Sequence, residues 1–545
     1  MGWVEYAPFG RLDLVRGWLG LAGGGAALGM AAGAARGLLA LHRNGDWRNG
    51  TLWLGWLRAA PWIVGLGLAG AAAGIVTALL VRRAPRSRVF SVPLVVLAAA
   101  GLSLLVHDPV GALRAGSRPS VILVSIDTLR ADRLLGPQGA GTMPRLHALL
   151  EDGTVFAQAT SAAPWTLPSH VSLFLSQLPF DHGVRWVRNA ISPGRCTLAE
   201  RFRDAGYRTA AFTGGVYVAA HFGLNQGFEA YEDHDEEKEG GSAGIFSGAL
   251  GWVRRHRDAP FFLFVHTYEA HTPYRGASAL PRGRLGPVFR TEDVAAAQSG
   301  RLVLTEEERR YVSSLYDGDV RDADTHVAGF LEDLRGEGVL DDAVLVVLSD
   351  HGEDLWDHDV TRSPGHGHAL YEELVHVPLA VRAPGRVRAG ATLTTPVSLL
   401  DVAPTLLELC RLPADPGHRG RSLADALRTG TEPESRPVSS ESVQYGPDRF
   451  AVREGAVKVI VAPHPDRVHY DVRLDVLPVE MFDLAADPLE HDPVSGRAAT
   501  GAARVLDSAV TRARVALRGR SGGAEGAGAI PEALRERLRS LGYIQ

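Results

Sequence analysis

The chain has 545 residues, of which 46% are hydrophobic and 22% are charged, and its formal net charge is −5 at pH 7. This length accommodates a large soluble domain together with a second region. The slightly acidic balance excludes a dedicated nucleic-acid binder, because such proteins carry a basic excess on one domain.

Three charge-free apolar stretches lie near the amino terminus, at residues 18–35, 59–81 and 89–106. Each is close to the roughly 20 residues that a helix needs to cross a bilayer. One cleavable signal peptide would account only for the first stretch. We therefore predict a membrane segment with three transmembrane helices in residues 1–116.

The arginines of this segment indicate its orientation. The short second loop carries no acidic residue and four arginines, Arg82, Arg83, Arg86 and Arg88. Such a loop is typical of the cytoplasmic side. Four further arginines surround the first loop, so a simple count leaves the opposite orientation open. The higher density in the second loop favours a multi-pass cell-membrane protein whose soluble part lies outside the cytoplasm.

From about residue 117 the pattern becomes α/β. Short apolar runs predict buried parallel strands at residues 121–126, 209–212, 261–265 and 343–348. Amphipathic stretches between them predict helices, among them residues 197–205 and 316–334. Alternating strands and helices predict a mainly parallel sheet sandwiched by helices, which we assign to residues 117–432.

The pattern changes again near the carboxyl terminus. Residues 450–461 predict two strands joined by a turn at Glu454–Gly455. A Gly/Ala-rich linker at residues 521–529 precedes a predicted short helix at residues 531–541. We therefore predict a smaller α+β subdomain in residues 433–545.

The cysteines and lysines are few. Cys196 and Cys410 lie far apart, so spacing leaves open either one disulfide or two separate thiols, and we interpret both as packing residues. The only lysines are Lys238 and Lys458, and the other basic residues are arginines.

Two predicted strands end on residues that can hold a metal ion. Asp127 follows residues 121–126, and Asp350 and His351 follow residues 343–348 after one serine. The carboxyl ends of parallel strands line one crevice, so these groups can converge. Two carboxylates and an imidazole suit a divalent cation such as zinc, manganese, magnesium or calcium. Taken singly, each residue is equally consistent with a loop cap or a surface acid.

A threonine lies in a segment that reads Ala-Pro-Trp-Thr-Leu-Pro-Ser-His, residues 163–170. Pro168 suits the first turn of a helix, which puts Thr166 at or just before the amino end of that helix. Backbone amides there attract an oxyanion, and a metal-bound hydroxyl loses its proton more readily. Spacing alone leaves open whether Thr166 is a nucleophile or only caps the helix.

Several histidines accompany these groups. The strand at residues 261–265 leads to His266 and then to His271. His366 and His368 form an HxH pair that could bind metal, or one of them could protonate a leaving group.

Taken in order, these segments resemble the sulfatase family of the alkaline phosphatase superfamily. The similarity extends from about residue 121 to the carboxyl terminus. It rests on residues 121–130, 166–170, 261–274, 348–353, 366–378, 400–405, 481–488 and 538–544.

The resemblance implies a mechanism for the site residues. Asp127, Asp350 and His351 match the metal ligands of the family, and Thr166 matches the nucleophile, which also touches the metal. His170 ends the nucleophile motif, where the resemblance implies contact with the substrate.

The resemblance also implies roles for the later histidines. His271 matches a histidine that holds the transferred group or its leaving oxygen. His366 matches the residue that assists the leaving group, with His368 as a second substrate-binding candidate.

Departures from the family pattern are informative. Typical sulfatases carry cysteine or serine at the Thr166 position and oxidise it to formylglycine, but threonine could give only a ketone. Where the family motif ends in arginine this chain has His170, and where many members carry a second aspartate it has Thr128. Lys238 and Lys458 lie outside the motifs that supply the sulfate-clamping lysines.

These departures favour relatives that move phosphoryl groups, namely nucleotide phosphodiesterases and the phosphoglycerol and phosphoethanolamine transferases of cell envelopes. The leading hypothesis is a membrane-anchored, metal-dependent hydrolase or transferase that forms a phospho-Thr166 intermediate. Its partners would be the membrane and an envelope lipid, a glycan or a small phosphate or sulfate ester. A sulfatase that works without formylglycine and a non-catalytic binding protein are the alternatives.

Overall fold

The computed structural model describes residues 118–234, 241–358, 361–470, 474, 476–494, 502–518, 525–526, 531–532 and 534–536. The three predicted transmembrane helices and most of the predicted helix at residues 531–541 lie outside these residues. Within the described ranges, no helix is both long enough and apolar enough to cross a bilayer. Arg118–Gln545 form one compact unit.

A nine-stranded sheet forms the centre of this unit, in the order β10-β2-β8-β7-β1-β6-β4-β5, with β9 beside β2. β1 is parallel to β6 and β7, and β4 is parallel to β5 and β6, whereas β8 is antiparallel to both of its neighbours. The prediction of a mainly parallel sheet is confirmed. The strands are β1 (Val121–Ile126), β2 (Thr154–Thr160), β4 (Arg208–Gly214), β5 (Ala230–His234), β6 (Phe261–Thr267), β7 (Val344–Leu348), β8 (His376–Arg382), β9 (Ala391–Leu393) and β10 (Val397–Ser398).

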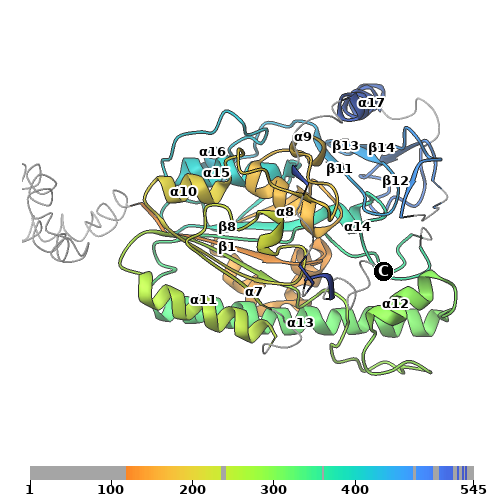
Figure 1. Ribbon diagram of the computed structural model, residues 1–545, viewed down its shortest axis with the longest axis horizontal. Coiled ribbons are helices and arrows are strands. Elements are labelled where there is room, and N and C mark those ends of the chain that lie inside the picture. Colours follow the sequence, from red (N-terminus) through yellow and green to blue (C-terminus); the bar gives the residue numbers. More distant parts are fainter. Residues whose placement is uncertain are drawn as a thin grey trace, which may run out of the picture. The chain divides into compact units, whose positions relative to one another are not determined.

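Helices cover both faces of the sheet (Figure 1), because the central strands are apolar on both sides. Alternate residues of β1 point into the two cores: Leu123 packs in one core and Ile122 in the other. The first core is covered by α8 (Thr166–Leu175), α10 (Leu198–Asp204), α15 (Val402–Leu409) and α16 (Ala424–Thr429), and the second by α7 (Pro144–Leu150), α11 (Ser242–His256) and α13 (Glu306–Gly336).

Capping boxes fix the start of two of these helices. Thr197 accepts a hydrogen bond from the backbone amide of Glu200, whose side chain accepts from the Thr197 amide, so the predicted helix at residues 197–205 begins at Leu198. Thr305 and Glu308 form the same box for α13. α13 therefore begins at Glu306, ten residues before the predicted start at residue 316. These first turns were missed in the sequence because they are rich in charged residues, so the helical spacing of apolar residues is not visible there.

Shorter elements connect these layers. They are α5 (Ala131–Leu134), α6 (Gly136–Thr142), α9 (Pro179–His182), β3 (Asn189–Ala190), η2 (Ala220–Phe222), α12 (Thr291–Gln298), α14 (Glu372–Val375) and η3 (Leu399–Asp401).

A second, antiparallel sheet follows in the order β11-β13-β14-β16. β13 and β14 confirm the strand–turn–strand prediction at residues 450–461. One face packs against α17, whose Val505, Ala509 and Ala513 are buried. The elements are β11 (Val438–Glu441), β12 (Gly446–Pro447), β13 (Phe450–Glu454), β14 (Val457–Val461), β15 (Val468–His469), β16 (Val479–Asp483), α17 (Ala502–Arg518) and β17 (Glu525–Gly526).

Buried ion pairs join the second sheet to α14. The Lys458 ammonium lies 2.8 Å from Glu372 Oε1 and 3.0 Å from Glu490 Oε1, and Arg453 pairs with the other oxygen of Glu372 at 2.8 Å. Burial opposes ionisation of Glu372, but Lys458 and Arg453 hold its pKa below the usual value. Lys458 is therefore a structural cation.

Removing this cation is expected to destabilise the protein strongly. Lys458→Met leaves Glu372 and Glu490 buried without their ammonium partner, a change that costs about 3–5 kcal/mol in comparable sites. Urea unfolding of the full chain measures the loss. Arg504→Met is the matched control, since Arg504 is largely exposed and pairs with Glu454 at the surface. Equal unfolding midpoints for the two variants would contradict the assignment.

Candidate active site

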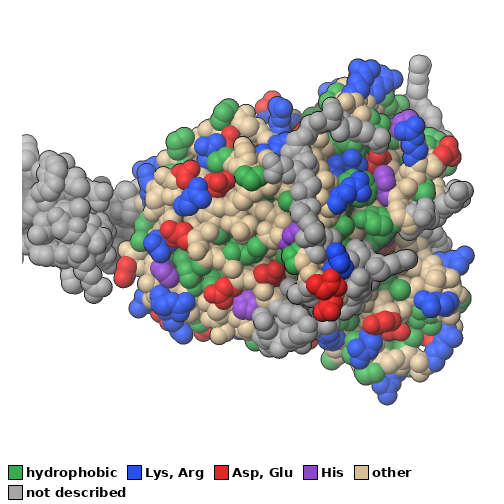
Figure 2. Space-filling view, in the orientation of Figure 1, with side chains coloured by type: hydrophobic (Ala, Val, Ile, Leu, Met, Phe, Trp, Pro, Cys, Tyr) green, Lys and Arg blue, Asp and Glu red, His purple; other side chains and the backbone are tan. Residues whose placement is uncertain are grey.

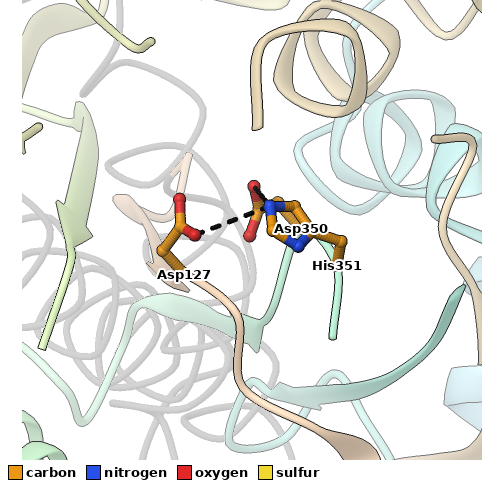
Figure 3. Close-up of side chains that lie close together, drawn as sticks. All are labelled: Asp127, Asp350 and His351. Atoms are coloured by element: carbon orange, nitrogen blue, oxygen red, sulfur yellow. Dashed lines mark ion pairs between the residues drawn. The ribbon is translucent and has the colours of Figure 1, made fainter. Parts of the chain in front are cut away.

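Three side chains converge at the carboxyl ends of β1 and β7 (Figure 3). Asp127 follows β1, while Asp350 and His351 follow the neighbouring parallel strand β7. One ligand atom from each lies within 4.8 Å of the other two, and all three side chains are fully buried. His351 Nε2 is 3.4 Å from Asp350 Oδ2 and 3.6 Å from Asp127 Oδ1. The structure thus brings together the three predicted metal ligands.

The carboxyl oxygens of this cluster fit a cation. Asp127 Oδ1 and both oxygens of Asp350 are buried and have no hydrogen-bond partner. No lysine or arginine of the described residues forms an ion pair with either aspartate. Burial raises the pKa of Asp127, and the charge of Glu353 raises it further. Burial and the charge of Asp127 raise the pKa of Asp350. A divalent cation would supply the missing positive charge.

His351 is oriented as a neutral ligand. Its Nδ1–H donates to the carbonyl oxygen of Gly352 at 2.9 Å, so the lone pair of Nε2 faces the carboxylates. Burial lowers the pKa of His351, which keeps the ring neutral. Metal-binding histidines commonly use their second nitrogen in this way.

Thr166 is the first residue of α8 and its side chain is fully buried. Trp165, not Thr166, occupies the capping position and has extended backbone angles. The Thr166 hydroxyl lies 3.2 Å from His351 Nε2 and 3.3 Å from Asp127 Oδ2. The hydroxyl therefore points into the metal cluster, and the backbone amides of the first turn of α8 surround it with partial positive charge.

His170 lies one turn further along α8 and is fully buried. Its Nδ1–H donates to the Thr166 carbonyl oxygen at 2.9 Å, and its Nε2 accepts from the Ser125 hydroxyl at 3.1 Å. Both ring nitrogens of this predicted substrate-binding residue are thus engaged by the chain itself. In this arrangement His170 supports the backbone of the residue that carries the hydroxyl.

His271 and His366 lie beside the cluster. Their ring centroids are 5.1 Å apart, and the ring of His366 is 4.5 Å from that of His351. His271 Nδ1–H donates to the Thr272 carbonyl oxygen at 2.6 Å, and His366 Nδ1–H donates to Glu353 at 3.3 Å. Burial lowers the pKa of both rings, that of His366 to about 3. Both rings are therefore neutral and oriented through Nδ1.

His368 is placed differently from His366. Its Nε2 pairs with Asp354 Oδ2 at 3.0 Å, and the residue is 4% exposed. The intervening Gly367 has a positive φ of 81°, which turns the chain between the two histidines. The structure brings only His366 of this pair against His351.

His266 was noted in the sequence after the strand at residues 261–265 but was assigned no role in the site. It lies on β6 in register with Ser125, and its Nε2 is 3.1 Å from Asp127 Oδ2. Its Nδ1–H donates to the Gly214 carbonyl oxygen at 2.9 Å, and burial lowers its pKa to about 3. A neutral ring therefore turns a lone pair toward a carboxylate oxygen, which adds to the negative potential that a cation would balance. The sequence offered one indication of its role: His266 is a polar residue that directly follows the apolar run of β6.

The remaining sequence expectations concern cysteines and lysines. Cys196 and Cys410 are both free, which excludes the disulfide alternative. Lys458 belongs to the buried ion pairs with α14, and Lys238 lies outside the described residues.

Comparisons with known proteins point to one family. Residues 119–412, more than half of the chain, match the family model described as "Sulfatase", and residues 367–507 match "N-sulphoglucosamine sulphohydrolase, C-terminal". Arylsulfatase K of Danio rerio is 25% identical over 362 residues, covering 56% of this chain and 67% of the relative. The arylsulfatase of Clostridium perfringens is 23% identical over 447 residues, covering 68% of this chain and 89% of the relative.

Solved structures share the fold. One was determined in complex with its substrate D-glucosamine-2-N,6-O-disulfate and has a TM-score of 0.60, with 17% identity, covering 76% of this chain and all of that chain. The phosphonate monoester hydrolase of Silicibacter pomeroyi has a TM-score of 0.58, with 20% identity, covering 75% of this chain and 99% of that chain.

Removal of the metal ion is expected to lower the thermal stability of the protein by an amount that depends on pH. Burial raises the pKa of Asp127 and Asp350, and a group with a raised folded-state pKa loses its stabilising contribution as pH rises through that pKa. The metal-free protein should therefore lose stability toward alkaline pH, while a bound cation offsets the carboxylate charge. Melting curves with and without a chelator should differ more at a high pH than at a low one, because the loss of stability begins above about pH 4, the ordinary pKa of aspartate.

The control for this experiment is Asp350→Asn, which removes one of the two carboxylate charges and should weaken the response to the chelator. Melting temperatures of the wild type that ignore the chelator at both pH values would contradict the metal assignment.

Proposed function

Because this chain belongs to the sulfatase family and is an enzyme acting on sulfate or phosphate esters, we propose that it hydrolyses or transfers a phosphate diester through a covalent phospho-Thr166 intermediate. The observation that carries this proposal is the Thr166 hydroxyl, which lies against Asp127 and His351 at the amino end of α8.

The identity of the nucleophile favours phosphorus over sulfur. In the typical sulfatases that the sequence resembles, this position carries the formylglycine aldehyde. The methyl group on Cβ of Thr166 excludes that aldehyde. The hydroxyl itself is then the attacking group, as in the phosphoryl-transferring relatives that the sequence resembles.

The charge balance of the site favours an ester with one negative charge. Two carboxylates would be offset by one divalent cation, and the surrounding imidazoles are neutral because burial lowers the pKa of His271, His351 and His366. Without a lysine or arginine paired to Asp127 or Asp350, a dianionic phosphate monoester would be poorly compensated. Phosphodiesters and sulfate monoesters both carry a single charge, and threonine as the nucleophile favours the diester.

The residues divide the reaction between them. A cation held by Asp127, Asp350 and His351 would lower the pKa of the Thr166 hydroxyl and offset charge on the transferred group. Thr166 Oγ1 gives up its proton as it forms a bond to phosphorus, and the bond to the leaving oxygen breaks. The neutral ring of His366 takes up a proton at Nε2 and passes it to the leaving oxygen, so that the net proton transfer runs from Thr166 to that oxygen, while His271 holds the group in line. Water or an acceptor hydroxyl then attacks phosphorus and gives its proton, through His366, to the departing Thr166 oxygen.

The setting of the reaction is part of the proposal. The three apolar stretches before residue 107 support a membrane anchor with the catalytic domain outside the cytoplasm. An envelope lipid or glycan that carries the diester would meet such a domain. On the face drawn in Figure 2, basic and acidic side chains are interspersed, which supports the expectation that nucleic acid is not a partner.

A sulfatase that works without formylglycine is the second candidate. It is favoured by the relatives named arylsulfatases and by the fold shared with a protein bound to a sulfated glucosamine. The non-catalytic alternative is disfavoured by the family match and by the complete Asp127–Asp350–His351 cluster.

A paired substrate panel tests the proposal. Aryl and alkyl phosphodiesters should outpace the matched sulfate esters, and Thr166→Ala should lower turnover by more than about 1,000-fold. Thr166→Ser keeps a hydroxyl and should retain part of the activity. Thr325→Ala on the exposed side of α13 is the control. Full turnover in Thr166→Ala would contradict the proposal. Sulfate release that is faster than cleavage of the matched phosphodiesters would favour the second candidate.

The leaving-group role of His366 gives a separate prediction. His366→Ala should lower the rate about 100-fold for an alkyl leaving group, which needs a proton, and much less for a nitrophenyl leaving group. His368→Ala is the matched control, because His368 pairs with Asp354 and should show no dependence on the leaving group. Equal losses for both leaving groups in His366→Ala would contradict the role.

A further inference from the structure

Tyr268 lies beside the nucleophile although no motif drew attention to it. It follows β6 by one residue, and its side chain is buried, with 8% of the residue exposed. Its ring centroid is 5.1 Å from that of His266 and 4.5 Å from that of His271. Thr166 is among the groups that influence the Tyr268 hydroxyl, and His266, against which the ring packs, lies 3.1 Å from the same Asp127 oxygen that the Thr166 hydroxyl approaches at 3.3 Å. Tyr268 therefore packs between His266, which contacts Asp127, and His271.

A glycine makes room for this ring. Gly215 follows β4 and has a positive φ of 86°, and a Cβ added there would lie 1.8 Å from Cε2 of Tyr268. Only a residue without a side chain fits at this position with the ring in place. The tyrosine thus fills the space that a side chain at position 215 would otherwise occupy.

The Tyr268 phenol is a neutral donor. The pKa of a tyrosine hydroxyl is ordinarily about 10. The hydroxyl therefore carries its proton near neutral pH and can donate a hydrogen bond.

We propose that Tyr268 is a catalytic residue that donates a hydrogen bond to a non-bridging oxygen of the group transferred to Thr166. The inference rests on the proposed function. When Thr166 Oγ1 bonds to phosphorus, the other oxygens on that phosphorus lie next to Oγ1, on the side of the site where the Tyr268 ring packs against His266 and His271. The proton stays on the phenol, so only the Oγ1–phosphorus bond forms and only the leaving-group bond breaks.

A neutral donor also suits the proposed substrate. It stabilises charge that develops on the transferred oxygens without adding a positive charge to the site. A singly charged ester needs less compensation than a dianion. Tyr268 would thus supply part of the stabilisation that lysines provide in typical sulfatases.

The first test is Tyr268→Phe in the full chain, with an alkyl phosphodiester as substrate. Loss of one such donor lowers kcat by roughly 100-fold or more, with KM changed little. Tyr311→Phe is the matched control, because the Tyr311 hydroxyl donates to the Gly286 carbonyl oxygen away from the site. Wild-type kcat in Tyr268→Phe would overturn the proposal.

A second measurement separates hydrogen bonding from packing. Fluorotyrosine at position 268 keeps the shape but makes the phenol a stronger donor, so a catalytic role predicts a changed kcat and a purely structural role predicts none. Gly215→Ala displaces the ring, and its effect should not add to that of Tyr268→Phe. Additive losses, or a kcat unaffected by fluorination, would overturn the proposal.

These outcomes are distinguishable from failure of the proposed function itself. If Thr166→Ala abolishes turnover while Tyr268→Phe is fully active, phosphoryl transfer through Thr166 stands and the role of Tyr268 falls. If turnover is independent of Thr166, both fall.

Discussion

The repulsion between two buried carboxylates organises this active site. Asp127 and Asp350 follow adjacent parallel strands, so the sheet delivers both to one point, and neither has a lysine or arginine partner among the described residues. Burying like charges without compensation is costly, and a divalent cation resolves the conflict. The sheet could hold this arrangement because two large apolar cores stabilise the strands independently of the site.

The same constraint explains the state of the surrounding histidines. Backbone carbonyl oxygens accept from Nδ1 of His266, His271 and His351, so each ring turns Nε2 toward the site. Burial keeps the rings neutral, and the site therefore combines one expected dication with neutral donors. Thr166 enters this environment from the amino end of α8, held in part by the hydrogen bond from His170 to its carbonyl oxygen. In the proposed reaction, Thr166 needs activation but no modification.

The sequence predicted what local pattern encodes. The apolar runs of β1 and β7 located Asp127, Asp350 and His351, and Pro168 indicated the helix that presents Thr166. The HxH spacing alone did not show which histidine of the pair faces the metal ligands. The turn at Gly367 directs His366, and not His368, toward them. His266 was noted without a role, and Tyr268 and Gly215 were not noted, since the importance of all three lies in contacts between β1, β4 and β6. Charged first turns likewise concealed the beginning of α13.

The central claim is that Thr166 becomes covalently phosphorylated during turnover. Rapid acid quenching of the full-length enzyme with a phosphodiester, followed by peptide mass mapping, tests it most directly. The account predicts a phosphorus-containing adduct on the peptide that includes Thr166, formed at a rate compatible with turnover. Continued turnover with an unmodified Thr166 at every quench time, or an adduct on another residue, would contradict it.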